Sequence, residues 1–126
     1  MLHAEAQFQM SVVAALKAAG HFVFAVSNGW GKMTAGQAVR AKLEGIMPGV
    51  SDLILLLPNK VYFIEIKNPN GKGRQSPAQR EFEQDVRAMG HNYMIWDNFR
   101  QVEQFINAHR KDIGNFMAVG GTNDEK

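Results

Sequence analysis

The stretch DLILLLPNKVYFIEIK, residues 52–67, contains two apolar runs separated by a Pro-Asn pair that favours a tight turn. Neither run alternates apolar with polar residues as a half-exposed strand does, so we expect a β-hairpin in the middle of a sheet with both faces covered. A turn of even length places Asp52 directly opposite Glu65, and the two-residue period of a strand adds Lys67 to the same face. The hairpin therefore predicts three charged side chains together at one end of a buried sheet.

These three charges need a further partner. Two facing carboxylates repel each other and lose hydration on burial, so a cation is expected between them. Lys67 supplies part of that charge, whereas a divalent ion supplies it fully and prefers hard oxygen ligands. We expect Mg²⁺ or Mn²⁺ at this site. Two simpler interpretations stay open: Glu65 and Lys67 as a structural ion pair, and Asp52 as a residue that merely starts a strand.

The composition limits the class of protein. The chain has 126 residues, of which 45% are hydrophobic and 21% charged, values that fit one folded domain with its own core. It has no cysteine, which excludes disulfides and a cysteine nucleophile and is compatible with a reducing cytoplasm. No apolar run is long enough for a membrane helix and no secretion signal opens the sequence, so we expect a soluble protein that is not exported.

Capping signals divide the rest of the chain. A Thr, Ser or Asn followed three residues later by Gln marks three helix starts, and glycines mark helix ends. We expect helices over residues 4–19, 34–45, 76–89 and 98–111, and strands over residues 21–27, 52–57, 61–67 and 91–96. This α-β-α-β-β-α-β-α order predicts one domain over residues 1–113. The glycine-rich, polar residues 114–126 are expected to form a flexible tail.

Glu5 is a further candidate for the site. It lies on the same helical stripe as Phe8 and Val12, which should face the sheet. A glutamate in the first turn of a helix can also simply complement the helix dipole. Both interpretations stay open.

The runs GIMPGVSDLILL, EIK and SPAQ, in this order, resemble the virus-type replication-repair nuclease domain, VRR-NUC, a branch of the PD-(D/E)xK nuclease superfamily. The resemblance extends over residues 5–106. It implies an α/β fold with a restriction-endonuclease-like core, in which helices flank a central mixed four-stranded sheet. By this resemblance Asp52 and Glu65 match the metal-binding acids and Lys67 matches the catalytic lysine.

The same resemblance assigns two more positions. Glu5 matches the acid of the first helix, and Gln79 matches the glutamine of the last motif, although Gln79 is also the capping-box residue of its helix. From the chemistry of a metal site, we expect Glu5 to hold a metal-bound water or a second ion and the backbone carbonyl of Ile66 to be a third metal ligand. One departure from the superfamily pattern is Ser51 in place of the proline that precedes the aspartate.

The implied activity is metal-dependent hydrolysis of phosphodiester bonds in DNA, which leaves a 5′-phosphate and a 3′-hydroxyl. The ion would lower the pKa of a bound water, and Lys67 would offset charge that grows on the phosphate. Stand-alone members of the family resemble resolvases of four-way (Holliday) junctions, which act as homodimers because a junction needs two symmetric cuts. We expect such an endonuclease in replication, recombination or repair, in the cytoplasm of a bacterium or a phage-infected cell. A flap-specific or restriction-type nuclease and a non-catalytic DNA-binding module stay open.

Basic residues gather in two segments without acids, residues 30–43 and 66–80. We expect these segments to contact DNA phosphates with little sequence readout, although solvated loops have the same composition. The predicted phosphate-binding residues are Lys32, Arg40, Lys42, Lys72, Arg74 and Arg80.

Overall fold

A mixed sheet is the centre of the molecule. The computed structural model describes residues 3–26, 33–71 and 73–116. Within them, one four-stranded sheet has the order β1 (Phe22–Ala25), β2 (Leu53–Leu57), β3 (Lys60–Ile66) and β4 (Asn92–Trp96). β2 pairs antiparallel with β1 and with β3, whereas β4 pairs parallel with β3. The expected mixed four-stranded sheet is confirmed.

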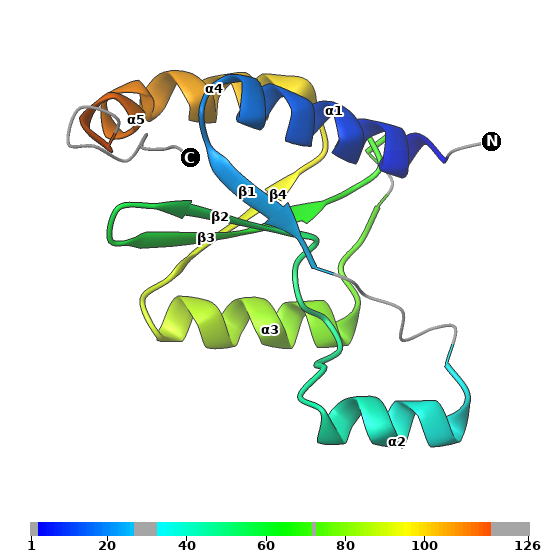
Figure 1. Ribbon diagram of the computed structural model, residues 1–126. Helices are drawn as coiled ribbons and strands as arrows, with labels where there is room; N and C mark the ends of the chain where they lie inside the picture. The colour runs from blue at the N-terminus through cyan, green and yellow to red at the C-terminus, as the bar shows by residue number, and fades with distance from the viewer. Residues whose placement is uncertain (1–2, 27–32, 72, 117–126) are drawn as a thin grey trace, which may run out of the picture.

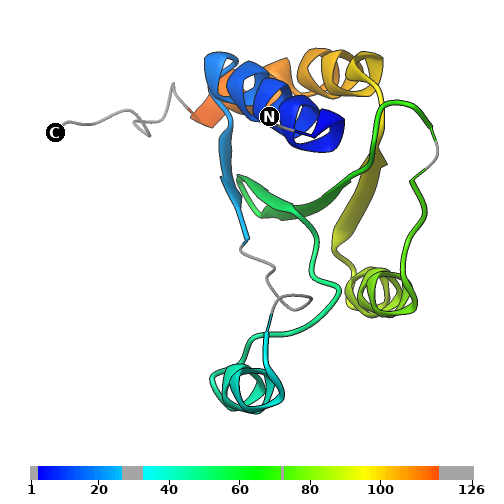
Figure 2. The same cartoon turned by 90° about the vertical axis from the view of Figure 1, so that its right-hand side faces the viewer.

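The helices cover this sheet unevenly. They are α1 (Ala4–Ala18), α2 (Ala35–Leu43), α3 (Pro77–Ala88), α4 (Phe99–Ala108) and α5 (Arg110–Phe116). Helices α1, α4 and α5 lie over one face, α3 lies beneath β3 and β4 on the other, and α2 projects away from the body of the domain (Figures 1 and 2). None of the helices in the described residues combines the length and the apolar character that crossing a bilayer requires.

The turn between β2 and β3 sets the register of the hairpin. The ring of Pro58 restricts its φ to about −65°, and Asn59 has a φ of 63°, a combination typical of a type II turn. Leu53 lies opposite Ile64, so residues 52 and 65 meet where the paired strands end. The predicted even length of the turn, here two residues, and the predicted register are confirmed.

The core lies between the sheet and α1 and α4. Alternate residues of each strand point toward these helices, so the apolar side chains of β2 and β3 meet the apolar stripe of α1. Full burial of a side chain of this kind stabilises a fold by about 1.5–3 kcal/mol. The buried residues include Phe8, Val12, Leu16, Leu53, Leu55, Ile64, Ile66, Trp96, Val102 and Phe105.

The opposite face of the sheet differs from the expectation that both faces of the hairpin are covered. Helix α3 covers β3 and β4, and Phe63 packs edge to face on Phe82 with ring centroids 5.3 Å apart. No helix in the described residues covers β1 and β2, where Phe22, Phe24 and Leu56 are 64%, 43% and 38% exposed. The reason is that α2, which follows β1 along the chain, projects outward.

The C-terminal region also differs from the prediction of one helix to residue 111 and a tail from residue 114. Helix α4 ends at Ala108, and α5 extends to Phe116. His109 lies between them, where its ring nitrogens contact the Phe105 carbonyl at 2.9 Å and the Tyr62 hydroxyl at 3.2 Å. These two contacts accompany the break between the helices, for which the sequence carries no glycine or proline signal. Residues 117–126 lie outside the described residues.

Candidate active site

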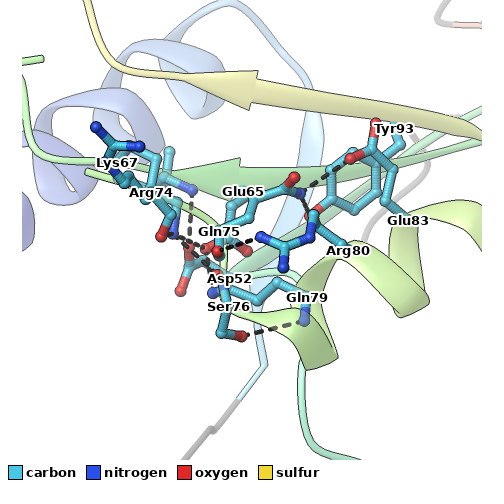
Figure 3. A network of polar contacts seen from close by, with 11 residues as sticks. Asp52, Glu65, Lys67, Arg74, Gln75, Ser76, Gln79, Arg80, Glu83 and Tyr93 are labelled. Atoms are coloured by element: carbon cyan, nitrogen blue, oxygen red, sulfur yellow. Dashed lines mark hydrogen bonds and ion pairs between the residues drawn. The ribbon is translucent and has the colours of Figure 1, made fainter. Parts of the chain in front are cut away.

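The predicted charges converge where β2 begins and β3 ends, beside the start of α3 (Figure 3). Asp52 directly precedes β2, Glu65 is the last residue but one of β3, and Lys67 follows that strand. The Ile66 N–H donates a hydrogen bond of 2.7 Å to Oδ2 of Asp52, which fixes this carboxylate against β3. The hairpin register thus brings together the three side chains that the sequence places there.

Glu65 is a carboxylate in the interior of the protein, only 2% exposed. Its burial and the neighbouring Asp52 raise the pKa of Glu65 to about 7, although Lys67 acts in the opposite direction. Burial also raises the pKa of Asp52, against the hydrogen bond from Ile66 and the charge of Lys67. In the described part of the chain, Oε1 of Glu65 has no hydrogen-bond partner. The carboxylate pair is therefore short of positive charge.

The ammonium of Lys67 is held in one position by three oxygen atoms. They are Oε2 of Glu65 at 3.3 Å, Oε1 of Gln79 at 3.0 Å and the Arg74 carbonyl at 3.1 Å. Three acceptors match the three donors of an ammonium group. The side chain is 12% exposed, and its stem passes Gly73, where a Cβ would lie 3.1 Å from Cδ of Lys67.

Gln79 belongs to the helix cap and to the site at once. Its N–H donates to the Ser76 hydroxyl at 3.1 Å, and its Oε1 accepts from the Ser76 N–H at 2.8 Å, which confirms the capping box. The same Oε1 accepts from Lys67, and Nε2 donates a hydrogen bond of 2.7 Å to Glu65. The start of α3 therefore positions both the carboxylate and the amine.

Glu5 lies at the edge of this cluster. Its side chain is exposed in the first turn of α1. Partial burial and the charge of Asp52 raise the pKa of Glu5, while Lys67 lowers it, so the carboxylate senses both groups. Among the described residues, no three His, Asp or Glu side chains are placed to hold a metal ion together. Glu5 does not complete a set of three side-chain ligands, and its role through a water stays a prediction, as does coordination by the Ile66 carbonyl.

The donor set fits a divalent cation. Asp52 and Glu65 offer hard oxygen atoms of the kind that Mg²⁺ and Mn²⁺ prefer. One oxygen of each carboxylate, Oδ2 of Asp52 and Oε2 of Glu65, accepts a hydrogen bond that anchors the side chain. The buried, unpartnered Oε1 of Glu65 is the atom that a cation would satisfy.

The fold of the chain, but not its sequence, matches a known domain. No family model matches the sequence, and no curated protein sequence matches it. A solved structure described as a VRR_NUC domain superposes with a TM-score of 0.61 over 84% of this chain and 97% of that chain, with 22% sequence identity. The chain has the fold of a VRR_NUC domain. This confirms the α/β fold that the resemblance implies.

Within this VRR_NUC fold, Gly49 connects the segment before Asp52 to α3. Its φ is 84°, and a Cβ at this position would overlap the carbonyl of Ala78. Only glycine permits this approach. Ser51, which stands where the resemblance leads us to expect proline, is buried and donates a hydrogen bond of 3.1 Å to the Leu53 carbonyl. The departure from the family pattern therefore leaves Asp52 in place.

A second polar network of the VRR_NUC fold borders Glu65 (Figure 3). Nε2 of Gln75 donates to Oε1 of Glu83 at 2.9 Å and to the Tyr93 hydroxyl at 3.3 Å. Burial, followed by the charge of Glu65, raises the pKa of Tyr93 to about 12, so the phenol keeps its proton at neutral pH. Sequence reasoning missed Gln75 and Tyr93. In the sequence, Tyr93 is marked only by its hydroxyl group in a mostly apolar strand, and Gln75 only by its position just before the helix cap at Ser76.

Two predicted phosphate-binding residues lie beside the site. Arg74 and Arg80 are exposed near the start of α3, and Nη1 of Arg80 donates to the Gln75 carbonyl at 3.0 Å. The backbone of Arg74 also holds Lys67, so its side chain lies on the segment that positions the amine. Lys72 lies outside the described residues.

The other predicted basic residues belong to the projecting helix. Arg40 and Lys42 are exposed on α2, away from the carboxylates. Arg40 pairs with Glu44 at 3.1 Å. Lys32 lies outside the described residues. The structure therefore separates the basic residues into a group at the site and a group on α2.

Proposed function

We propose that this chain is a Mg²⁺- or Mn²⁺-dependent DNA endonuclease of the virus-type replication-repair nuclease family, and that it hydrolyses phosphodiester bonds. The observation that carries the proposal is the convergence of Asp52, Glu65 and Lys67 at the end of the central hairpin. The VRR_NUC fold supports it, since the described residues match that architecture over most of the chain.

The side chains divide the chemistry between them. A divalent ion at Asp52 and Glu65 would supply a Lewis acid for a phosphoryl oxygen and a bound water of lowered pKa. Gln79 and Lys67 both contact Oε2 of Glu65, which leaves Oε1 for the ion. The ammonium of Lys67 lies beside the carboxylates, where it can stabilise negative charge that develops on the phosphate. Positioning of these groups before substrate binds is the main contribution of the protein.

We further propose branched DNA, in particular the four-way junction, as the substrate and a homodimer as the working unit. Arg74 and Arg80 flank the site, and Arg40 and Lys42 form a second basic group on α2. Such contacts grip the phosphate backbone of DNA and carry no sequence readout. Two symmetric copies suit a junction that needs two symmetric cuts. The cellular setting is replication, recombination or repair in a bacterial or phage-infected cytoplasm.

A cleavage assay tests the proposal. Labelled four-way junction, flap and linear duplex are incubated with the protein in Mg²⁺ or in EDTA, beside Lys67→Ala and a control, Lys60→Ala, at the turn end of β3. We expect Mg²⁺-dependent cleavage that prefers the junction, a loss of at least about 100-fold in Lys67→Ala, and none in Lys60→Ala. Equal cleavage of linear duplex would remove the junction assignment. DNA binding without cleavage of any substrate would identify a non-catalytic DNA-binding module.

A further inference from the structure

Two apolar surfaces are uncovered in the described part of the chain. The first, here called the β1–β2 face, consists of Phe22, Phe24, Ile54 and Leu56 on the side of the sheet opposite α1. Phe22 and Phe24 are 64% and 43% exposed, and their rings contact each other edge to face with centroids 6.2 Å apart. Contiguous apolar patches of this kind on a folded chain mark interaction sites.

The second surface is the outer stripe of α2. Val39 and Leu43 lie one helical turn apart and are 61% and 84% exposed, and Ile46 and Met47 extend the stripe beyond the end of the helix. Helix α2 has nine residues, whereas isolated helices shorter than about 12–15 residues are marginal in water. Ala41 is the one residue of α2 that is buried in the described structure, so the capping box and this single contact leave the longer apolar side chains of the helix unpacked. The helix therefore needs an apolar surface to lie against.

The two surfaces do not meet within one chain. Helix α2 stands clear of the sheet in both views (Figures 1 and 2). The segment that returns from α2 to β2 is held at Gly49, which packs on the Ala78 carbonyl at the start of α3. This contact ties the segment between α2 and β2 to the start of α3, and Figure 2 shows α2 beside α3 and separated from the sheet.

We propose that the two surfaces cover each other between two copies of this chain, with α2 of each protomer lying across the β1–β2 face of its partner. A two-fold axis then relates two identical contacts, so the α2 stripe and the β1–β2 face are buried in both protomers. This is the geometry of an isologous dimer. Pairing of α2 with α2 would leave Phe22, Phe24 and Leu56 in water. This interface rests on the homodimer proposed above. It does not depend on the nuclease reaction.

The exposed aromatic side chains supply part of the area that a stable dimer buries. A fully buried aromatic side chain contributes about 150–250 Å², so the exposed parts of Phe22 and Phe24 in two protomers supply on the order of 400 Å². A standard interface buries about 1,200–2,000 Å² in total. The two α2 stripes and Leu56 add to this area. Lys42 and Arg40, which pairs with Glu44, flank the stripe.

Chemical cross-linking tests which surfaces meet, since the chain has no cysteine of its own. Leu43→Cys is mixed with Phe22→Cys, Phe24→Cys or Leu56→Cys, and a short bis-maleimide is added. We expect a mixed cross-linked dimer between position 43 and at least one position of the β1–β2 face. Met89→Cys, exposed at the end of α3, serves as the control and should give none. Cross-links only between two copies of position 43, or no cross-links, would overturn the proposal.

Light scattering after size exclusion gives an independent test. Leu43→Glu and Phe22→Glu should each raise the dissociation constant of the dimer by about 100-fold, because each buries a charge in the contact. Met89→Glu should leave it unchanged. A wild-type monomer at all concentrations, or a dimer insensitive to both substitutions, would contradict the inference. Neither measurement uses DNA or metal, so a dimer without nuclease activity would overturn the proposed reaction and uphold this interface.

Discussion

Nε2 of Gln79 donates a hydrogen bond of 2.7 Å to Oε2 of Glu65. Because Lys67 contacts the same oxygen at 3.3 Å, this side of the carboxylate is anchored. The other oxygen, Oε1, has no hydrogen-bond partner in the described residues. Outer contacts of this kind orient a metal ligand before the metal binds.

Gln79→Ala should therefore weaken both the fold and metal binding. We expect the free energy of unfolding to fall by about 1–3 kcal/mol, from the lost cap and the lost donor to a buried carboxylate. The affinity for Mg²⁺ should fall about 10–100-fold. Urea unfolding and calorimetric titration with Mg²⁺ measure the two effects.

Gln37→Ala is the matched control, because Gln37 forms the same capping box on α2 without contacts to the carboxylates. Gln37→Ala should lower the free energy of unfolding by at most about 1 kcal/mol and leave the affinity for Mg²⁺ unchanged. Equal losses of Mg²⁺ affinity in the two variants would show that Gln79 acts only as a cap.

Gly49→Ala should displace the start of α3 from Asp52. The new Cβ would overlap the Ala78 carbonyl, so we expect a loss of about 3 kcal/mol or more in the free energy of unfolding, together with the loss of cleavage. Gly45→Ala carries only backbone strain, since φ is 95° and nothing lies within 4 Å of the added Cβ. Gly45→Ala should lower the free energy of unfolding by about 1 kcal/mol. Urea unfolding followed by circular dichroism measures this loss for both variants, and similar losses in the two would rule out the overlap with the Ala78 carbonyl as the cause.

The pH dependence of stability follows from Glu65. Its pKa is raised from 4.5 to about 7 in the folded, metal-free protein, so the folded state binds a proton that the unfolded state has lost. This contribution to stability is fully present below pH 4.5 and is lost as the pH rises through about 7. In EDTA, the free energy of unfolding should fall between pH 5 and pH 8 by on the order of 2 kcal/mol.

Two controls accompany this titration. Glu65→Gln has no carboxyl group to titrate, so its free energy of unfolding should vary less over the same pH range. Mg²⁺ should restore the stability of the wild-type protein at pH 8, because it binds the ionised carboxylates. The same pH slope in wild type and Glu65→Gln would locate the titrating group elsewhere.

Arg74→Ala should weaken binding to all DNA substrates by a similar factor. The substitution keeps the carbonyl that holds Lys67 and removes one phosphate contact, so the slope of log affinity against log salt should decrease by about 1. Arg110→Ala, on α5 far from the site, serves as the control. Fluorescence anisotropy at several salt concentrations gives the slopes. An unchanged slope in Arg74→Ala would remove this residue from the DNA-binding surface.

Local signals made much of this molecule predictable. A two-residue turn fixes the hairpin register, and that register alone brings Asp52 to Glu65. The capping boxes at Thr34, Ser76 and Asn98 mark three helix starts because each satisfies free backbone groups within four residues.

Tertiary relationships were not predictable in this way. The contact of His109 with Tyr62 joins residues 47 positions apart, and no pattern in the sequence predicts the helix break that it accompanies. The apolar run of β2 predicts burial on both faces, which holds for Leu53 and Leu55 but not for Leu56, which is 38% exposed.

Anomalous diffraction from crystals soaked in Mn²⁺ tests the central claim most directly, that Asp52 and Glu65 together hold a divalent ion. We expect one strong anomalous peak in contact with both carboxylates, on the Oε1 side of Glu65, and no peak in Glu65→Gln crystals soaked in the same way. A soaked wild-type crystal with no Mn²⁺ at these carboxylates, or with Mn²⁺ bound elsewhere only, would contradict the proposed metal site.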